Sequence, residues 1–129
     1  MLISVASIVS ISLAFGFALL HLALALKAPL GAYVLGGAHR VSPPKQRVLS
    51  GGLVFIFALI GLVFLQRYGA IGGMFSAAFV TAILIAYTGF LGFAIIGNGF
   101  LTKSPKEKAV MTPISAVGFV CALAVLIWG

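Results

Sequence analysis

Few side chains in this chain are able to do chemistry, and they are spread thinly along it. The 129 residues include one acidic side chain, Glu107, together with two histidines and one cysteine. Glycosidic catalysis needs two carboxylates, a nucleophile needs a base and an orienting group beside it, and a metal needs several ligands at fixed spacing. The sequence contains no such set, and no phosphate-loop or nucleic-acid motif. We therefore expect no catalytic residue, no metal and no cofactor, and we interpret the chain as a protein other than an enzyme.

His21 is the one ionisable side chain inside an apolar stretch of the sequence. Ionisable residues at membrane depth are candidates for function, because burying them is costly. On a helix, His21 shares a face with small and hydroxyl side chains, and Thr81 and Thr88 of a later stretch offer further hydroxyls. These three residues are the candidate intramembrane polar site. A neutral histidine that is merely hydrogen-bonded to a threonine or a backbone carbonyl is the simpler interpretation, and no second histidine is placed to complete a bis-histidine haem.

Two short polar segments resemble helix starts and provide a second candidate site. They read SPPKQRVLS (42–50) and SPKEKAVMT (104–112), with serine as N-cap and proline at the first helical position. Helix N-termini attract anions, and the planar fork of arginine suits phosphate. The candidate residues for an anion or lipid-headgroup site are Arg40, Ser42, Arg47, Lys103 and Ser104. Diffuse attraction of anionic lipid by the same bases is the alternative that we favour.

Four apolar stretches must position these residues. They cover about residues 2–26, 48–65, 70–97 and 109–128, and a bilayer crossing takes about 20 mostly apolar residues. Since 63% of the residues are hydrophobic and only 7% are charged, a water-facing surface cannot be built from this composition. The sequence therefore predicts an all-α integral membrane protein, a single domain over 1–129 that forms a bundle of four transmembrane helices.

The basic side chains predict how this bundle is oriented. Seven of the eight Lys and Arg residues fall in the first and third connections, and only Arg67 lies in the second. Basic connections stay on the cytoplasmic side of a membrane. We therefore expect a multi-pass protein of the inner (plasma) membrane with both termini outside the cytoplasm. The same bases make anionic membrane lipid, and not nucleic acid, the expected partner.

The two SP segments also indicate an internal repeat. Their serines stand 62 residues apart, at positions 42 and 104, and VLGG (34–37) and IIGN (95–98) correspond with a slip of one residue. Because each unit holds two helices, both copies would share one orientation, which makes two tandem helical hairpins in a parallel repeat. In the second segment Glu107 follows Ser104 by three residues, the spacing of a capping box. A chance likeness between two cytoplasmic helix starts explains the match equally.

Small and hydroxyl side chains indicate which helix faces meet, because they let helices approach closely. The stripes are Ser7, Ala14 and His21 with Ser10, Ala18 and Ala25 beside them in the first stretch, Ala77, Thr81, Thr88, Gly92 and Gly99 in the third, and Ser115, Gly118 and Ala122 in the fourth. We expect these stripes to form the bundle interior. Tyr87 lies off the third stripe, so we expect it to face lipid or another subunit.

The connecting segments resemble those of small bacterial membrane proteins of similar length that have no known activity. The likeness is carried by APLG (28–31), GG (36–37), PPKQR (43–47) and NGFLTKSPKEKAVMTP (98–113). The resemblance implies a four-helix integral membrane protein and implies no activity.

Two functions fit these patterns. One is a small transporter or channel-like protein that acts as an oligomer, because four short helices enclose little space. The other is an accessory or lipid-binding structural subunit of a larger membrane complex, which the apolar faces of the second stretch favour. An exporter of the small multidrug-resistance class is rejected, since it needs a glutamate embedded in the membrane and the four apolar stretches contain none. The expected partners are anionic lipid and either further copies of the chain or other membrane subunits.

The predicted orientation is tested by single-cysteine labelling in a Cys121→Ser background. An impermeant thiol reagent applied to intact cells should react with the Ala70→Cys variant and spare the Pro44→Cys variant, because basic connections are retained inside. Protection of the Ala70→Cys variant together with reaction of the Pro44→Cys variant would contradict the orientation.

Overall fold

The computed structural model describes residues 2–26, 29, 44–101 and 104–129, and these residues form four long helices. They are α1 (Leu2–Ala25), α2 (Pro44–Tyr68), α3 (Ala77–Ile96) and α4 (Pro105–Trp128), and a π-helical turn, η3 (Gly97–Leu101), continues α3. Each helix is long and apolar enough to cross a membrane. No strand occurs among the described residues, so the predicted class of four span-length helices is confirmed.

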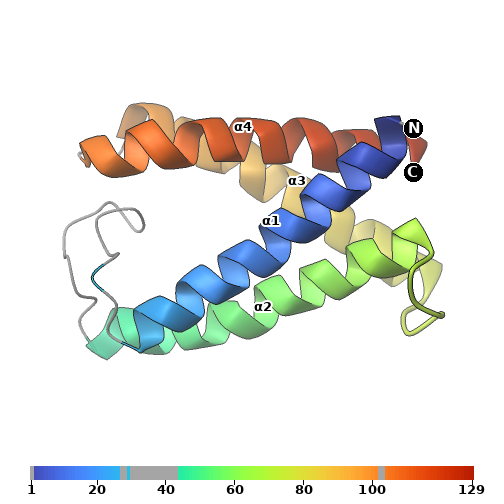
Figure 1. The fold of residues 1–129 in the computed structure, drawn as a ribbon, viewed down its shortest axis with the longest axis horizontal. Coiled ribbons are helices and arrows are strands. Elements are labelled where there is room, and N and C mark those ends of the chain that lie inside the picture. Colours follow the sequence, from blue (N-terminus) through green and yellow to red (C-terminus); the bar gives the residue numbers. More distant parts are fainter. Residues whose placement is uncertain (1, 27–28, 30–43, 102–103) are drawn as a thin grey trace.

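The helices alternate in direction along the bundle. Figure 1 shows both ends of the chain at one end of the bundle and the first turns of α2 and α4 at the other. The most extensive packing joins α1 to α2 and α3 to α4, while α1 also packs on α4 and α2 on α3. Two hairpins of the same direction therefore stand side by side, as a parallel tandem repeat requires. A pseudo-two-fold relation between them stays a prediction.

The first turns of α2 and α4 begin earlier than the apolar stretches predict. These helices start at Pro44 and Pro105, about one turn before the predicted positions 48 and 109. Proline is tolerated in a first turn, where its missing N–H would lack an intrahelical partner anyway. At α4 the Ser104 hydroxyl caps the helix by accepting a hydrogen bond from the Glu107 N–H at 3.3 Å. The earlier start brings Glu107 into α4.

The connection between α2 and α3 is longer than predicted, because α3 begins at Ala77 and not near residue 70. Gly69 ends α2 in a left-handed conformation (φ 91°), which glycine adopts without strain. The Gln66 side chain then holds the connection through two hydrogen bonds of 2.9 Å to the backbone of Phe75. Ser76 caps α3 by accepting from the Phe79 N–H at 3.2 Å. Because of these local contacts, α3 begins only at Ala77.

The predicted inward stripes are right for most residues of two helices and only partly right for a third. The stripe residues of α1 and α4 are buried, including Ala14 and Gly118, except Ala25, which is half-buried. In α3 the buried face consists of Val80, Leu84, Tyr87, Thr88 and Leu91, whereas Ala77 and Thr81 are exposed. Larger side chains thus fill the interior along α3. Tyr87 is 3% exposed and packs edge-on against Phe64 at 5.6 Å, so the expectation that it faces lipid or another subunit is wrong within this chain.

Gly118 marks a close contact of α1, α3 and α4. A Cβ atom added at Gly118 would lie 3.2 Å from the Leu13 side chain of α1 and 3.3 Å from that of Leu91 in α3. These distances are shorter than ordinary contacts, so the two leucine side chains would have to move to admit a larger residue. At Gly92 the nearest side-chain atom, from Phe119, would lie 3.4 Å away, an ordinary contact.

We predict that Gly118→Leu destabilises the bundle and that Gly89→Leu does not. Overpacking a filled contact costs about 1–3 kcal/mol, whereas a Cβ at Gly89 would have no atom within 4 Å. Thermal unfolding of both variants in mild detergent measures the difference. Equal midpoints for the two variants would contradict this packing.

Candidate functional site

A cavity of about 270 Å³ lies between the helices, in the half of the bundle where α2 and α4 begin. Every helix contributes to its wall. The lining residues are Phe17, Leu20 and His21 of α1, Leu53 and Phe57 of α2, Phe90, Leu91 and Ala94 of α3, Asn98 of η3, and Glu107, Met111 and Ser115 of α4. Most of this wall is apolar, and a few polar side chains converge on it, which is the usual character of a small-molecule site.

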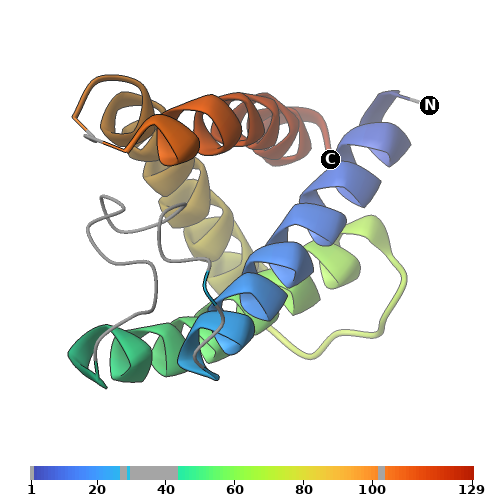
Figure 2. The ribbon, with the colours of Figure 1, turned by 60° about the vertical axis from the view of Figure 1, so that its left-hand side comes forward.

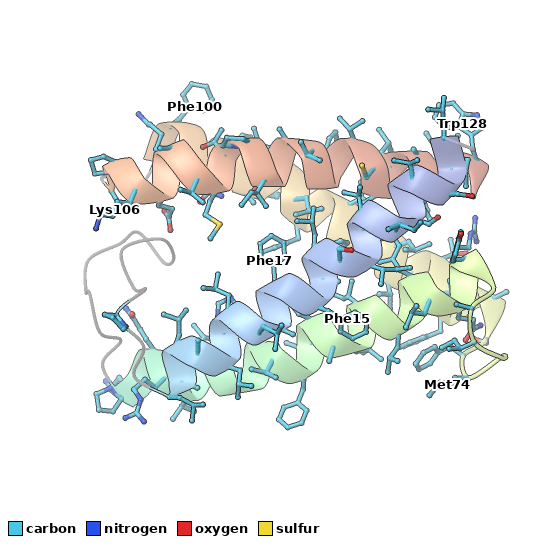
Figure 3. All side chains as sticks on the ribbon, viewed as in Figure 1. Phe15, Phe17, Met74, Phe100, Lys106 and Trp128 are labelled. Carbon is cyan, nitrogen blue, oxygen red and sulfur yellow. The ribbon has the colours of Figure 1, made fainter. Side chains whose placement is uncertain are left out.

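Three phenylalanines from three helices form the aromatic part of the wall. Phe57 of α2 is buried and lies at its centre, with ring-centroid distances of 5.3 Å to Phe17 and 6.1 Å to Phe90. The Phe57–Phe90 pair is edge-to-face, an arrangement that aromatic rings favour. Figure 3 shows Phe17 extending from α1 on the side of α4, whereas Phe15 lies over α2. The cavity therefore has a rigid aromatic face.

His21 borders the cavity and is held in place from two sides. Its Nδ1 lies 3.3 Å from the Ser50 hydroxyl, and its ring stacks on Phe57 with a centroid distance of 5.5 Å and an interplanar angle of 8°. Among the described residues, the His21 ring has no hydrogen-bond partner other than Ser50. The ring can donate or accept at each nitrogen according to its tautomer.

The π-helical turn η3 positions a second polar group of the wall. The Asn98 amide Nδ2 donates to the Ser115 hydroxyl of α4 at 3.1 Å. π-Helical turns are rare and recur at functional sites, because the extra residue per turn redirects nearby side chains. Here the turn joins the end of α3 to α4 through side chains that both line the cavity.

Glu107, the one acidic residue of the chain, is the third polar group of the wall. It is only 4% exposed although it lies in the first turn of α4. From the sequence, Glu107 was expected only as part of the capping box at Ser104, because the apolar stretch of the fourth helix begins at 109. The signal was present in the capping spacing, which places the helix start at Ser104 and its third residue inside the bundle.

The structure does not bring the predicted intramembrane polar residues together. Thr81 is exposed, and the Thr88 hydroxyl donates to the Leu84 carbonyl of its own helix at 2.7 Å. The hydrogen-bond partner of His21 is instead the Ser50 hydroxyl. Ser50 was not predicted as a site residue, because it lies in the first turns of a stretch that is otherwise apolar.

The predicted anion site is described only in part. Arg47 Nε donates to the Ala25 carbonyl at 3.0 Å, where a cation at the C-terminus of α1 is favourable. Ser104 caps α4. The other three residues, Arg40, Ser42 and Lys103, lie outside the described residues. The site therefore stays a prediction.

The chain matches no protein-family model, no curated protein and no solved structure. Within the described ranges, no three His, Cys, Asp or Glu side chains gather where they could hold a metal ion. The function must therefore be inferred from the cavity and the side chains that line it.

The cavity predicts different outcomes for two alanine-to-leucine changes. Ala94→Leu projects into the cavity and should leave the unfolding midpoint unchanged or raise it, because added apolar contacts fill empty space. Ala122→Leu enters the packed part of the core, where Ala122 is 0% exposed, and should cost about 1–3 kcal/mol. Thermal unfolding in one detergent compares them. If Ala94→Leu lowered the unfolding midpoint as much as Ala122→Leu does, the space beside Ala94 would already be filled by the protein itself.

Proposed function

We propose that this protein is a multi-pass plasma-membrane protein that binds an amphipathic membrane molecule in the cavity between its four helices. The observation that carries the proposal is the composition of the wall. Phe17, Phe57 and their apolar neighbours offer a surface for a hydrocarbon part, and the polar side chains of His21, Asn98 and Glu107 lie nearer the end where α2 and α4 begin. Such a graded wall suits a molecule with an apolar body and a polar end.

The distribution of bases supports a cytoplasmic position for this end of the bundle. Lys45 and Arg47 lie in the first turn of α2, and Lys106 and Lys108 lie in the first turn of α4. By the positive-inside rule these turns face the cytoplasm, and both termini face outward. Figure 3 shows Lys106 and Trp128 at opposite ends of α4. Anionic lipid headgroups attracted by these bases are part of the proposal.

The packed half of the bundle supports binding over conduction. Beyond the cavity, Val63, Phe64 and Leu84 are each 0% exposed and Tyr87 is 3% exposed. A channel through a single chain would have to displace these side chains. All four helices of one chain contribute to the wall of the cavity. Assembly with further copies or other membrane subunits is also part of the proposal.

Transport of the bound molecule is a second candidate, and a specific feature of the wall favours it. A cavity confined to one half of a bundle is the geometry of a carrier that is open to one side. Two irregular features lie in the helices that line the cavity. They are the π-helical turn η3 at the end of α3 and Pro113 within α4. Both interrupt the regular hydrogen-bond ladder and are common sites of bending.

Filling the cavity should abolish binding while the fold is kept. Ala94→Phe places a ring in the cavity, whereas Ala82→Phe adds the same ring at an exposed position of the same helix. Native mass spectrometry of protein extracted in mild detergent should show a bound amphiphile in the parent and in the Ala82 variant, and none in the Ala94 variant. Equal retention by both variants would contradict binding in the cavity.

A further inference from the structure

We propose that the bound amphiphile enters the cavity laterally from the bilayer, between α2 and α3, and that the Phe90 side chain controls this entry. The inference rests on the proposed function and adds the route by which the molecule reaches its site. It follows from the position of Phe90, which belongs both to the cavity wall and to the exposed flank of α3.

Phe90 differs from the rest of the cavity wall in its exposure. It is 51% exposed, whereas every other described residue that lines the cavity is buried or half-buried. Phe90 also lies near the middle of the segment formed by α3 and η3, far from either end of the bundle. In a bundle that spans a bilayer, its exposed surface therefore meets the hydrocarbon core.

Helical geometry places Phe90 at the boundary between two flanks of α3. With about 100° between successive residues, Leu91 and Ala94 adjoin Phe90 on one side, and both line the cavity. Gly89 and Phe93 adjoin it on the other side, where both are exposed and neither lines the cavity. A Cβ atom added at Gly89 would have no atom within 4 Å, so this flank is open. The Phe90 ring therefore stands between the cavity and the lipid-facing surface.

The contact of α2 with α3 is closed on one side of Phe90 and weak on the other. These two helices share the least contact of the four neighbouring helix pairs. In the packed half, the buried rings of Phe64 and Tyr87 join them, 5.6 Å apart. Beside the cavity the described ring contact is Phe57–Phe90, at 6.1 Å. Figures 1 and 2 show α3 diverging from α2 beyond this level, toward the first turn of α2.

Phe90 is the member of the Phe57–Phe90 pair that is free to rotate. Phe57 is buried and also packs on Phe17 at 5.3 Å and on His21 at 5.5 Å, so three neighbours hold its ring. Among the described residues, Phe90 contacts no ring other than that of Phe57. Exposed side chains exchange rotamers on the picosecond to nanosecond timescale. Rotation of Phe90 therefore opens the contact without a change of backbone.

A lateral route suits an amphiphile because neither of its parts has to change environment. Exposing hydrocarbon to water is unfavourable in proportion to its area, whereas passage between α2 and α3 keeps the hydrocarbon part against apolar side chains. The polar end remains nearer the first turn of α2, level with His21 and Asn98, while the hydrocarbon part passes Phe90. The amphiphile thus enters at the depth that it already occupies in the bilayer.

Cysteine labelling inside the cavity tests the route. Met111, which lines the cavity from α4, is replaced in a Met111→Cys variant with the Cys121→Ser background, and the full chain is placed in lipid nanodiscs. Two methanethiosulfonates are compared, a lipophilic benzyl reagent and an anionic, water-soluble sulfonatoethyl reagent. Mass spectrometry of the intact protein follows the labelling rate. The test variants are Phe90→Ala and Phe90→Trp, and Phe93→Ala is the matched control, because Phe93 is an exposed ring of the same helix outside the cavity.

We expect Phe90→Ala to accelerate labelling by the benzyl reagent at least fivefold and Phe90→Trp to slow it at least twofold, because the ring obstructs the route. Phe93→Ala should change the rate less than twofold, and labelling by the sulfonatoethyl reagent should change less than twofold in all three variants. An unchanged benzyl rate in Phe90→Ala would overturn lateral entry, as would an equal acceleration in Phe93→Ala or of both reagents.

Retention of the copurified amphiphile separates this inference from the proposed function. If Phe90→Ala left the benzyl rate unchanged while Ala94→Phe still removed the amphiphile, binding in the cavity would stand and only the route would be wrong. If Ala94→Phe retained the amphiphile, the proposed function would fail and the inference with it.

Discussion

The close approach of α1 to two neighbouring helices is the contact on which the rest of the structure depends. Gly61 of α2 lies so near the Phe15 ring that an added Cβ would stand 2.6 Å from it, and a Cβ at Gly118 of α4 would lie 3.2 Å from the Leu13 side chain. Two glycines thus fix a short segment of α1 between α2 and α4. Figure 2 shows α2 and α4 separating from each other toward their first turns. The cavity lies in that half of the bundle, and neither Gly61 nor Gly118 lines it.

Sequence reasoning predicted the number of helices and the buried faces of α1 and α4, because small residues at helical spacing identify contacts directly. It failed where side-chain size and local capping compete with hydropathy. Along α3, large residues such as Tyr87 fill the interior and Thr81 faces outward. Hydropathy placed the fourth span at 109–128, whereas the capping signal at Ser104 correctly predicted the start of α4 at Pro105. The cavity itself depends on how far helices diverge, which no local pattern encodes.

Charged side chains gather at the end of the bundle where α2 and α4 begin. Bases such as Lys106 and Lys108 are exposed at the helix starts, where we propose that anionic headgroups bind. The single carboxylate, Glu107, is enclosed in the bundle beside His21 and the phenylalanines. Burial of an acid is costly unless its side chain is paired, and Glu107 has interactions of its own within the chain.

Methyl NMR tests most directly whether the cavity holds an amphiphile. Met111 lines the cavity and Met74 lies exposed in the connection between α2 and α3, so methionine methyl groups report on both places. Spectra of the protein in nanodiscs are compared with its copurified amphiphile present and after its removal. Binding in the cavity predicts a shift of the Met111 resonance and an unchanged Met74 resonance. An unchanged Met111 resonance, or an equal shift of both, would contradict it.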